Sequence, residues 1–432
     1  MRNIVEQLRT GDWINRERTW LCSLALLVAS CAGFVFLFAT ADGLNDYQGR
    51  PLGTDFSKVY SAGTFVLDGQ PGRAFDPPAQ HAREQVIFGK DTPFYGWLYP
   101  PVFLFVAAAL ALLPYLVALA VYQAATLVLY LWMLRGILSS STVLSPQAPK
   151  GEEAGAAAQR GHRGLWLLVA IASPAVFVNI GHGHNGFLTA ALIGGALLLL
   201  DRKPVLAGVL FGLLVYKPHV GIMIPLVLIV TGRWRVLAAA TTTALALVAV
   251  TALAFGPDIW RSFVNALPFV REAVLEQGGT GWHKIQGVFS WVRMWGGSVP
   301  LAYAMQGAAM AILAVVLAWL WRSDASYRLK AAALPLVAIL ASPYSLDYDF
   351  VVLASAIAFL AVEGADRGFH AWEKTALALL WFLPLIARTL AEQALIPLGV
   401  PVMSLMLLLV LRRATAETGV FQRWHSAAHT IK

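Results

Sequence analysis

Long apolar segments alternate with short polar joints along most of the chain. The first apolar segment runs from Trp20 to Ala41, and the last one covers residues 396–411. Apolar segments of about 15 to 22 residues, separated by charged residues, proline or glycine, are typical of helices that cross a membrane. The pattern therefore predicts an all-α, polytopic membrane protein. The other predicted helices are 101–113, 115–135, 165–180, 187–200, 204–215, 220–231, 236–255, 300–321, 331–342, 350–363 and 374–391.

Basic residues give these helices an orientation. Four arginines precede the first apolar segment, which is too long for a signal peptide and is expected to be retained as a helix. Lys and Arg collect on the cytoplasmic side of membrane helices, so the N-terminus is expected in the cytoplasm. The joints 201–203, 233–235 and 322–330 and the pair Arg412-Arg413 are also basic. They should therefore lie on the same side.

Two long polar loops, residues 42–98 and 257–298, fall on the outer side in this topology. Loops of this length in a compact domain are usually functional. In the second loop, Trp260, Phe263, Leu267 and Val270 share a spacing that predicts an amphipathic helix lying at the membrane surface. Short surface helices are expected in the first loop as well.

The number of crossings depends on residues 101–135. If every apolar segment crossed, the tail after Arg413 would lie outside, which contradicts the basic joints. We therefore expect residues 101–113, or the neighbouring segment, to dip into the membrane without crossing, which leaves about 12 crossings. The whole chain, 1–432, is predicted to be one membrane domain. Residues 139–164, rich in Ser, Ala and Gly, are expected to be a cytoplasmic linker without chemistry.

Composition excludes two broad classes of protein. Of the 432 residues, 58% are hydrophobic and only 13% are charged, which is too apolar for a soluble globular protein. The net charge of +8 comes from residues at helix ends, so it is not the footprint of a nucleic-acid-binding surface. The sequence also lacks a P-loop, a His-Glu-x-x-His motif and a Gly-x-Ser-x-Gly motif.

The costly polar residues gather in the outer half of the predicted topology. Ionisable groups at membrane depth are expensive and tend to line a cavity. The residues concerned are Asp55, Lys58, His182, His184, Asn185, Lys217, His219, Asp347 and Asp349.

Five short motifs of the sequence, most of which contain one of these polar residues, resemble those of family 87 glycosyltransferases. They are Asp55-Phe56, Tyr99-Pro100-Pro101, the break at 183–186, Tyr216-Lys217-Pro218 and the stretch from Ser342 to Asp349. The resemblance implies an integral membrane enzyme of the GT-C superfold that takes a sugar from a polyprenyl-phosphate donor. It also implies that Asp55 is the catalytic residue.

The chain departs from the family pattern at two places. Related enzymes often carry Gly-Gln-x-Asn at the break, where this chain has Gly181-His182-Gly183-His184 followed by Asn185-Gly186. Mannosyltransferase members tend to have Trp before the late Asp and His after it, where Leu346, Tyr348 and Asp349 stand here. Mannose specificity and the roles of His182 and His184 therefore stay open.

The chemistry needs a single base. The acceptor hydroxyl must lose a proton as it attacks the anomeric carbon, and a positioned carboxylate such as Asp55 can take that proton. The leaving phosphate departs as an anion and needs no general acid. One carboxylate therefore suffices, where a glycosidase uses two, and the configuration of the anomeric carbon is expected to invert. Asp55 could alternatively be a helix N-cap without catalytic function.

Three basic residues, Lys58, Lys217 and Arg388, compete as the contact of the donor phosphate. Such a cation would stabilise the leaving group as charge develops. Lys217 could equally be a lysine that snorkels at a helix end. The residues alone do not rank the three.

Other polar residues are expected to contact substrate. Tyr99 could stack on a sugar or anchor the interface, and Tyr60 accompanies Asp55 in the first loop. His283 could contact the acceptor or simply belong to a solvated loop. Asp347-Tyr348-Asp349 looks like a metal-binding Asp-x-Asp, but nucleotide sugars are absent outside the cell, and two histidines are too few for a metal. The remaining candidates are His182, His184, Asn185, His219, Asp347 and Asp349, with no metal and no cofactor expected.

The sequence thus predicts an inverting glycosyltransferase in the inner membrane, with its active site facing the periplasm or cell exterior. A lipid or glycan would be the acceptor, and no nucleic acid would be a partner. Two alternatives remain. A transporter or lipid flippase would need broken helices in matching halves of the chain, and no internal repeat is present. A membrane acyltransferase would need a histidine centre, which His182 or His184 could supply.

Overall fold

The computed structural model describes residues 2–141 and 164–418, whose regular elements are helices joined by loops with isolated β-bridges. The predicted linker 139–164 lies almost wholly outside these residues. In chain order the helices are α1 (Arg2–Thr10), α2 (Arg16–Ala39), α3 (Thr54–Leu67), η1 (Pro71–Phe75), α4 (Pro77–Phe88), η2 (Pro101–Phe103), α5 (Leu104–Ala111), α6 (Tyr115–Leu138), an unlabelled helix Gly164–Ile171, α8 (Pro174–His182), α9 (Gly186–Leu199), α10 (Pro204–Leu213), η3 (Leu214–Tyr216), α11 (Pro218–Gly221), α12 (Ile224–Val230), α13 (Trp234–Phe255), α14 (Asp258–Val270), η4 (Arg271–Glu276), η5 (Trp282–Lys284), α15 (Val288–Met294), α16 (Val299–Arg322), α17 (Tyr327–Ala341), η6 (Asp347–Val352), α18 (Leu353–Arg367), α19 (Glu373–Ala394) and α20 (Gly399–Thr418).

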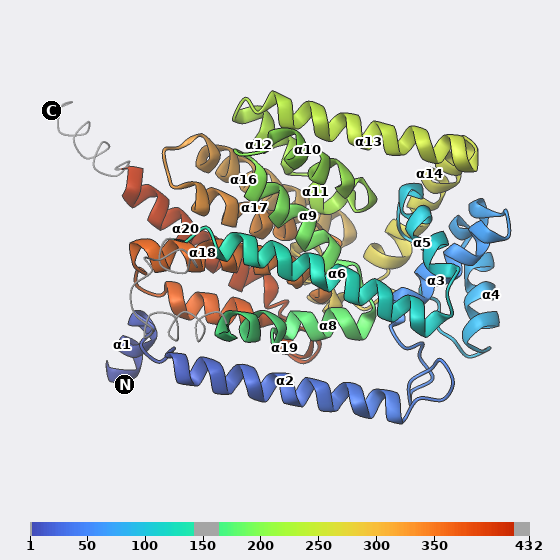
Figure 1. The fold of residues 1–432 in the computed structure, drawn as a ribbon, viewed down its shortest axis with the longest axis horizontal. Helices are drawn as coiled ribbons and strands as arrows, with labels where there is room; N and C mark the ends of the chain where they lie inside the picture. The colour runs from blue at the N-terminus through green and yellow to red at the C-terminus, as the bar shows by residue number, and fades with distance from the viewer. Residues whose placement is uncertain (1, 142–163, 419–432) are drawn as a thin grey trace, which may run out of the picture.

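The bundle has two chemically different ends (Figure 1). We call one the terminal end, where α1 packs against the start of α19 and the Trp372 amide donates to the Arg9 carbonyl at 2.7 Å. Arg328 joins this end through an ion pair with Asp366 at 2.7 Å. The loop end, on the right in Figure 1, carries α3, α4 and α14. The basic residues around 328 therefore share an end with the N-terminal helix, as the charge pattern predicts.

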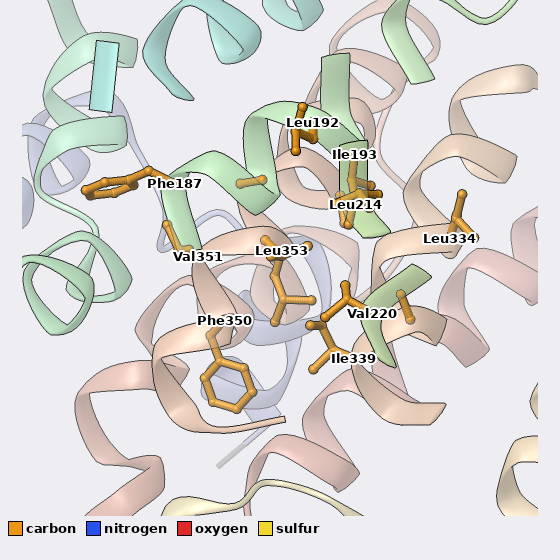
Figure 2. Packing of buried hydrophobic residues seen from close by; sticks show 14 of the residues in the cluster. Phe187, Leu192, Ile193, Leu214, Val220, Leu334, Ile339, Phe350, Val351 and Leu353 are labelled. Atoms are coloured by element: carbon orange, nitrogen blue, oxygen red, sulfur yellow. The ribbon is translucent and has the colours of Figure 1, made fainter. Parts of the chain in front are cut away.

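Helices at the surface and in the core differ in how much of them is covered. In the most apolar 18-residue window of each helix, 6% of residues are buried in α2 and 11% in α13, against 83% in the η6–α18 segment. Because apolar side chains are exposed along whole helices, lipid is the environment that suits α2 and α13. Figure 2 shows part of the core, in which Ile193 of α9, Ile339 of α17 and Phe350 of η6 belong to one cluster of buried side chains.

The number of crossings is not confirmed by helix length. Among the residues that the structure describes, seven helices are long and apolar enough to span a membrane, and an eighth results if the bent pair Gly164–Ile171 and Pro174–His182 is one span. Gly186–Leu199, Pro204–Tyr216 and Pro218–Val230 are apolar but shorter. At about 1.5 Å per residue, none of these three reaches across about 30 Å of hydrocarbon. The predicted count of about 12 therefore stays a prediction.

The short α5 helix agrees with a segment that dips in without crossing. Its C-terminal flank returns to α3, where the Tyr60 hydroxyl donates to the Leu113 carbonyl at 2.9 Å. The Cβ of a residue replacing Gly63 would lie 2.1 Å from the Ala107 carbonyl oxygen, so only glycine allows this approach of α3 to α5. The long α6 then leads to the terminal end. This packing of α3 on α5 and α6 fixes the helix that carries Asp55.

The second loop contains a helix over Asp258–Val270, as its spacing predicts. Phe263 on this helix packs edge-on against Phe75 of the first loop, with ring centroids 5.9 Å apart. The two long loops are therefore packed on each other. The location of α14 at a membrane surface remains a prediction.

Candidate functional site

Asp55 lies in the first turn of α3. The turn before the helix is held by Gly53, whose φ of 72° favours glycine, and by the Tyr115 hydroxyl, which donates to the Leu52 carbonyl at 2.6 Å. A carboxylate is stabilised at a helix N-terminus by the free backbone N–H groups and the helix dipole. One turn later, Lys58 Nζ donates to Asp55 Oδ1 at 2.6 Å. Local helix geometry alone thus forms the first ion pair of the site.

The Asp55 carboxylate is ionised in spite of its partial burial. The side chain is 13% exposed and that of Lys58 is 5% exposed. Burial by itself would raise the pKa of Asp55, but the charge of Lys58 and its hydrogen bond outweigh that effect and hold the pKa below its usual value of 3.8. A carboxylate with a low pKa is available as a proton acceptor at neutral pH.

Lys217 forms the second ion pair, at the break between η3 and α11. Its Nζ donates to Asp349 Oδ1 at 2.5 Å and to Asn185 Oδ1 at 3.1 Å. His184 Nε2 lies 3.5 Å from the same nitrogen. Lys217 is 3% exposed and Asp349 is 1% exposed. A lysine that is buried among three polar partners does not snorkel to an interface.

The break between α8 and α9 packs directly on the start of α3. Gly183 has a φ of 61°, and a Cβ there would lie 2.7 Å from the Cβ of Phe56. The His184 ring stacks on Tyr348, with centroids 3.7 Å apart. Two buried nitrogens of the break, His184 Nδ1 and Asn185 Nδ2, have no hydrogen-bond partner. Buried polar atoms without partners are rare and indicate a place where a ligand can bind.

A third group connects Asp55 with α19. Arg388 binds Asp347 through two bonds, Nε to Oδ2 at 2.6 Å and Nη2 to Oδ1 at 2.9 Å. The same Nη2 lies 3.0 Å from His182 Nε2. On the other side of the ring, His182 Nδ1 is 2.8 Å from the Thr54 hydroxyl and 3.9 Å from Asp55 Oδ2. Asp55 therefore has one oxygen on Lys58 and the other facing His182.

Two cavities border the first turn of α3: Lys58 lines one and Thr54 lines the other, whereas Asp55, which stands between them in sequence, lines neither. The larger has a volume of about 490 Å³, and part of its wall comes from α14. The smaller has a volume of about 360 Å³ and reaches α2 and α19. The polar residues that line the larger cavity include Lys58, Tyr99, His184, Lys217, His219, Arg271 and Asp349, and the apolar ones include Phe263, Val264, Leu267 and Val270. The smaller is lined by Arg50, Thr54, His182, Asp347 and Arg388, with Leu37, Val178 and Leu385 among its apolar residues.

The structure brings most of the predicted site residues to these two cavities, with Asn185 reaching the larger one through Lys217. Asp55, Tyr60 and His283 line neither cavity, and Asp55 is joined to the larger one through its bond with Lys58. Tyr60 instead packs edge-on against Tyr115, with centroids 5.2 Å apart, and the His283 carbonyl accepts a bond from Gln286. Sequence reasoning missed Thr54, Arg50 and the stacking role of Tyr348.

Both carboxylates of the Asp-x-Asp pair are bound to cations of the protein, Asp347 to Arg388 and Asp349 to Lys217. Within residues 2–141 and 164–418, no group of three or more His, Cys, Asp or Glu residues could hold a metal ion. The arrangement offers one carboxylate with an oxygen free of hydrogen bonds, that of Asp55, two lysines that share a cavity with apolar residues, and a second cavity. Such a site can bind an anion attached to an apolar chain and can deprotonate a hydroxyl group.

Comparison with known proteins gives one match. The sequence model of glycosyltransferase family 87 matches residues 97–343, which cover more than half of the chain. This range includes Tyr99, the α8–α9 break and Lys217 and begins after Asp55. No curated protein and no solved structure matches the chain.

Proposed function

Because the chain belongs to glycosyltransferase family 87, we propose that it moves one sugar, with inversion, from a polyprenyl-phosphate donor to a lipid or glycan acceptor. Family membership favours a glycosyltransferase over the transporter and acyltransferase alternatives. The donor, the acceptor and a location of the site at the outer face of the inner membrane are parts of the proposal. The single observation that carries it is the Asp55–Lys58 ion pair in the first turn of α3, where Lys58 lines the larger cavity and the neighbouring Thr54 lines the smaller one.

Lys58 and Lys217 are the proposed contacts of the donor phosphate. Both line the larger cavity, and the unpartnered Asn185 Nδ2 and His184 Nδ1 lie beside Lys217. Arg388 lines the other cavity, and its guanidinium group is already bound to Asp347 through two hydrogen bonds. Cations placed where charge develops stabilise a leaving group. The geometry thus supports the two lysines over Arg388 for this role.

The apolar wall of the larger cavity suits the lipid part of the donor. Phe263, Val264, Leu267 and Val270 belong to α14 and line the same cavity as the two lysines. Val264 is 57% exposed and Leu267 is 44% exposed, so apolar surface there is open to a ligand. A ligand with a phosphate at one end and an isoprenoid chain at the other matches this division.

Asp55 is the proposed base. Its Oδ1 is engaged by Lys58, which leaves Oδ2 to take the proton from the acceptor hydroxyl. As that proton transfers, the hydroxyl oxygen forms a bond to the anomeric carbon, and the bond from this carbon to the phosphate oxygen breaks. The bonding electrons leave with the phosphate, whose new negative charge the lysines stabilise. Attack from the face opposite the leaving group inverts the anomeric carbon.

The test is transfer by the full chain in lipid nanodiscs. Radiolabelled undecaprenyl-phosphate mannose, glucose and galactose serve as donors, and a total lipid extract of the producing membranes serves as acceptor. Asp55→Asn should lower transfer about 10²- to 10⁴-fold, the usual contribution of a general base. The matched control is Asp68→Asn, because Asp68 ends the same helix, is 50% exposed and pairs with Arg83.

The control should transfer sugar like the wild type. Full transfer by Asp55→Asn would remove Asp55 from the mechanism. Absence of transfer from all three donors by the wild type would contradict the proposed donor class.

A further inference from the structure

A directed chain of hydrogen bonds reaches Thr54 from α19. It begins at Asp347, which is 2% exposed and holds Arg388 through two bonds. Bidentate pairing fixes both the position and the plane of a guanidinium group. The Nη2 of Arg388 that contacts His182 is therefore held in place by a buried carboxylate.

The contact with Arg388 decides which nitrogen of His182 carries the proton. A guanidinium group has only donors, so the Nε2 atom that lies 3.0 Å from it must accept with its lone pair. In a neutral imidazole the proton is then on Nδ1. This N–H points to the Thr54 hydroxyl at 2.8 Å. A proton on Nε2 would face a donor with no acceptor between them.

Thr54 must then donate onward. Its oxygen accepts from His182, so its own hydrogen is free for another acceptor. Thr54 and His182 both line the smaller cavity, and Asp55 Oδ2 lies 3.9 Å from the ring on the same side. The last donor of the chain therefore lines the smaller cavity, and the Asp55 oxygen that Lys58 leaves free lies near the same His182 nitrogen as this donor.

We propose that Thr54 binds the acceptor hydroxyl in the smaller cavity and that His182 is a positioning residue that orients the Thr54 hydroxyl. The Thr54 O–H donates to the acceptor oxygen, and the acceptor hydrogen points to Asp55 Oδ2. The second lone pair of the acceptor oxygen then faces the anomeric carbon. This assignment rests on the proposed function. It places the acceptor in the smaller cavity and the donor in the larger one.

Removal of the Thr54 hydroxyl tests the contact. With the donors and lipid extract above, Thr54→Val should lower kcat/KM for the acceptor about 10- to 100-fold, because the acceptor loses one donor in a desolvated site. Thr54→Ser keeps the hydroxyl and should restore most of the loss. Binding of undecaprenyl phosphate, the product left by the donor, should stay within about twofold in both variants. Thr64→Val is the control, because Thr64 is on the same helix and bonds to Arg83 instead.

Three results would overturn the proposal. The first is a wild-type kcat/KM in Thr54→Val. The second is an equal loss of kcat/KM in the valine and serine variants. The third is a loss of kcat/KM that is matched by an equal loss of undecaprenyl phosphate binding. Failure of the proposed function looks different, because the wild type would then transfer no sugar.

The tautomer of His182 can be measured without any substrate. Solid-state NMR of the full chain labelled with ¹⁵N-histidine, assigned with His182→Gln, should show a neutral ring protonated on Nδ1. A ring protonated on Nε2, or on both nitrogens, would contradict the directed chain whether or not the enzyme is active.

Discussion

The two ends of the bundle both bury ion pairs, yet they differ in what adjoins them. At the terminal end, Arg413 is 3% exposed and binds Glu373 at 2.9 Å, and Glu363 lies 3.8 Å away. The cavity beside this pair holds only about 10 Å³, too little for more than one water molecule. At the loop end, Lys217 and Asp349 are buried to the same degree beside a cavity of about 490 Å³.

The comparison shows that burial of charge does not by itself identify a site. Removing one partner of a buried pair leaves an uncompensated charge, so both pairs contribute to stability in the same way. Buried nitrogens without a hydrogen-bond partner occur at both ends, Arg413 Nε at one and His184 Nδ1 and Asn185 Nδ2 at the other. Of the two pairs, the one at the loop end adjoins a cavity with room for a ligand. Room for a ligand next to the ion pair distinguishes the proposed reacting cluster from a structural one.

The largest expected effect is on stability at the terminal end. Arg413→Met leaves Glu373 and Glu363 without their shared partner and should lower the free energy of unfolding by about 3 to 5 kcal/mol. Transfer per folded molecule should stay within about twofold of the wild type, because Arg413 lies at the opposite end of the bundle from Asp55. Thermal unfolding in nanodiscs and the transfer assay measure the two quantities. Loss of transfer by the folded variant would contradict a purely structural role of the ion pair at Arg413.

The next effect is on transfer at the loop end. The double variant Lys217→Met with Asp349→Asn removes both charges, so no lone charge stays buried, and stability should change little. Transfer should fall about 10²- to 10³-fold, the usual cost of losing one group that stabilises developing charge. The same assays decide the outcome. Strong destabilisation with unchanged transfer would make this pair structural, like the one at Arg413.

A smaller effect concerns the pH dependence of transfer. Activity needs ionised Asp55, so it falls as the pH drops through the pKa of this carboxyl, which Lys58 holds below 3.8. Lys58→Met removes that charge while burial remains, so the pKa rises and the loss of activity begins at a higher pH. Lys90→Met, an exposed lysine in the same loop, is the control. An unchanged acid limb in Lys58→Met would mean that another group controls it.

The sequence predicted the helices well because their signals are local. The apolar stretch 236–255 is the helix Trp234–Phe255, and 300–321 is Val299–Arg322. The all-helical membrane class is confirmed. The number of crossings could not be derived from the sequence. A helix as short as α10 can be part of a membrane crossing only if neighbouring protein, not lipid, covers its ends. Whether protein covers them depends on tertiary packing.

The site shows the same division between local and distant information. Asp55 and Lys58 meet because they are three residues apart on one helix, which sequence spacing contains. Tyr60 was assigned to the site, but five residues turn a helix by about 500°, so its side chain lies about 140° away from Asp55. Lys217 and Asp349 are 132 residues apart, and no periodicity gives that contact. Thr54 carried no signal, because its role depends on a histidine from another helix.

The most direct test of the difference between the two ends is the position of a bound lipid phosphate. A cryo-EM structure of the full chain in nanodiscs with undecaprenyl phosphate should show the phosphate within hydrogen-bonding distance of Lys58 and Lys217 and the isoprenoid chain along α14. A phosphate bound at Arg388, or among the basic residues of the terminal end, would contradict the assignment of the larger cavity to the donor.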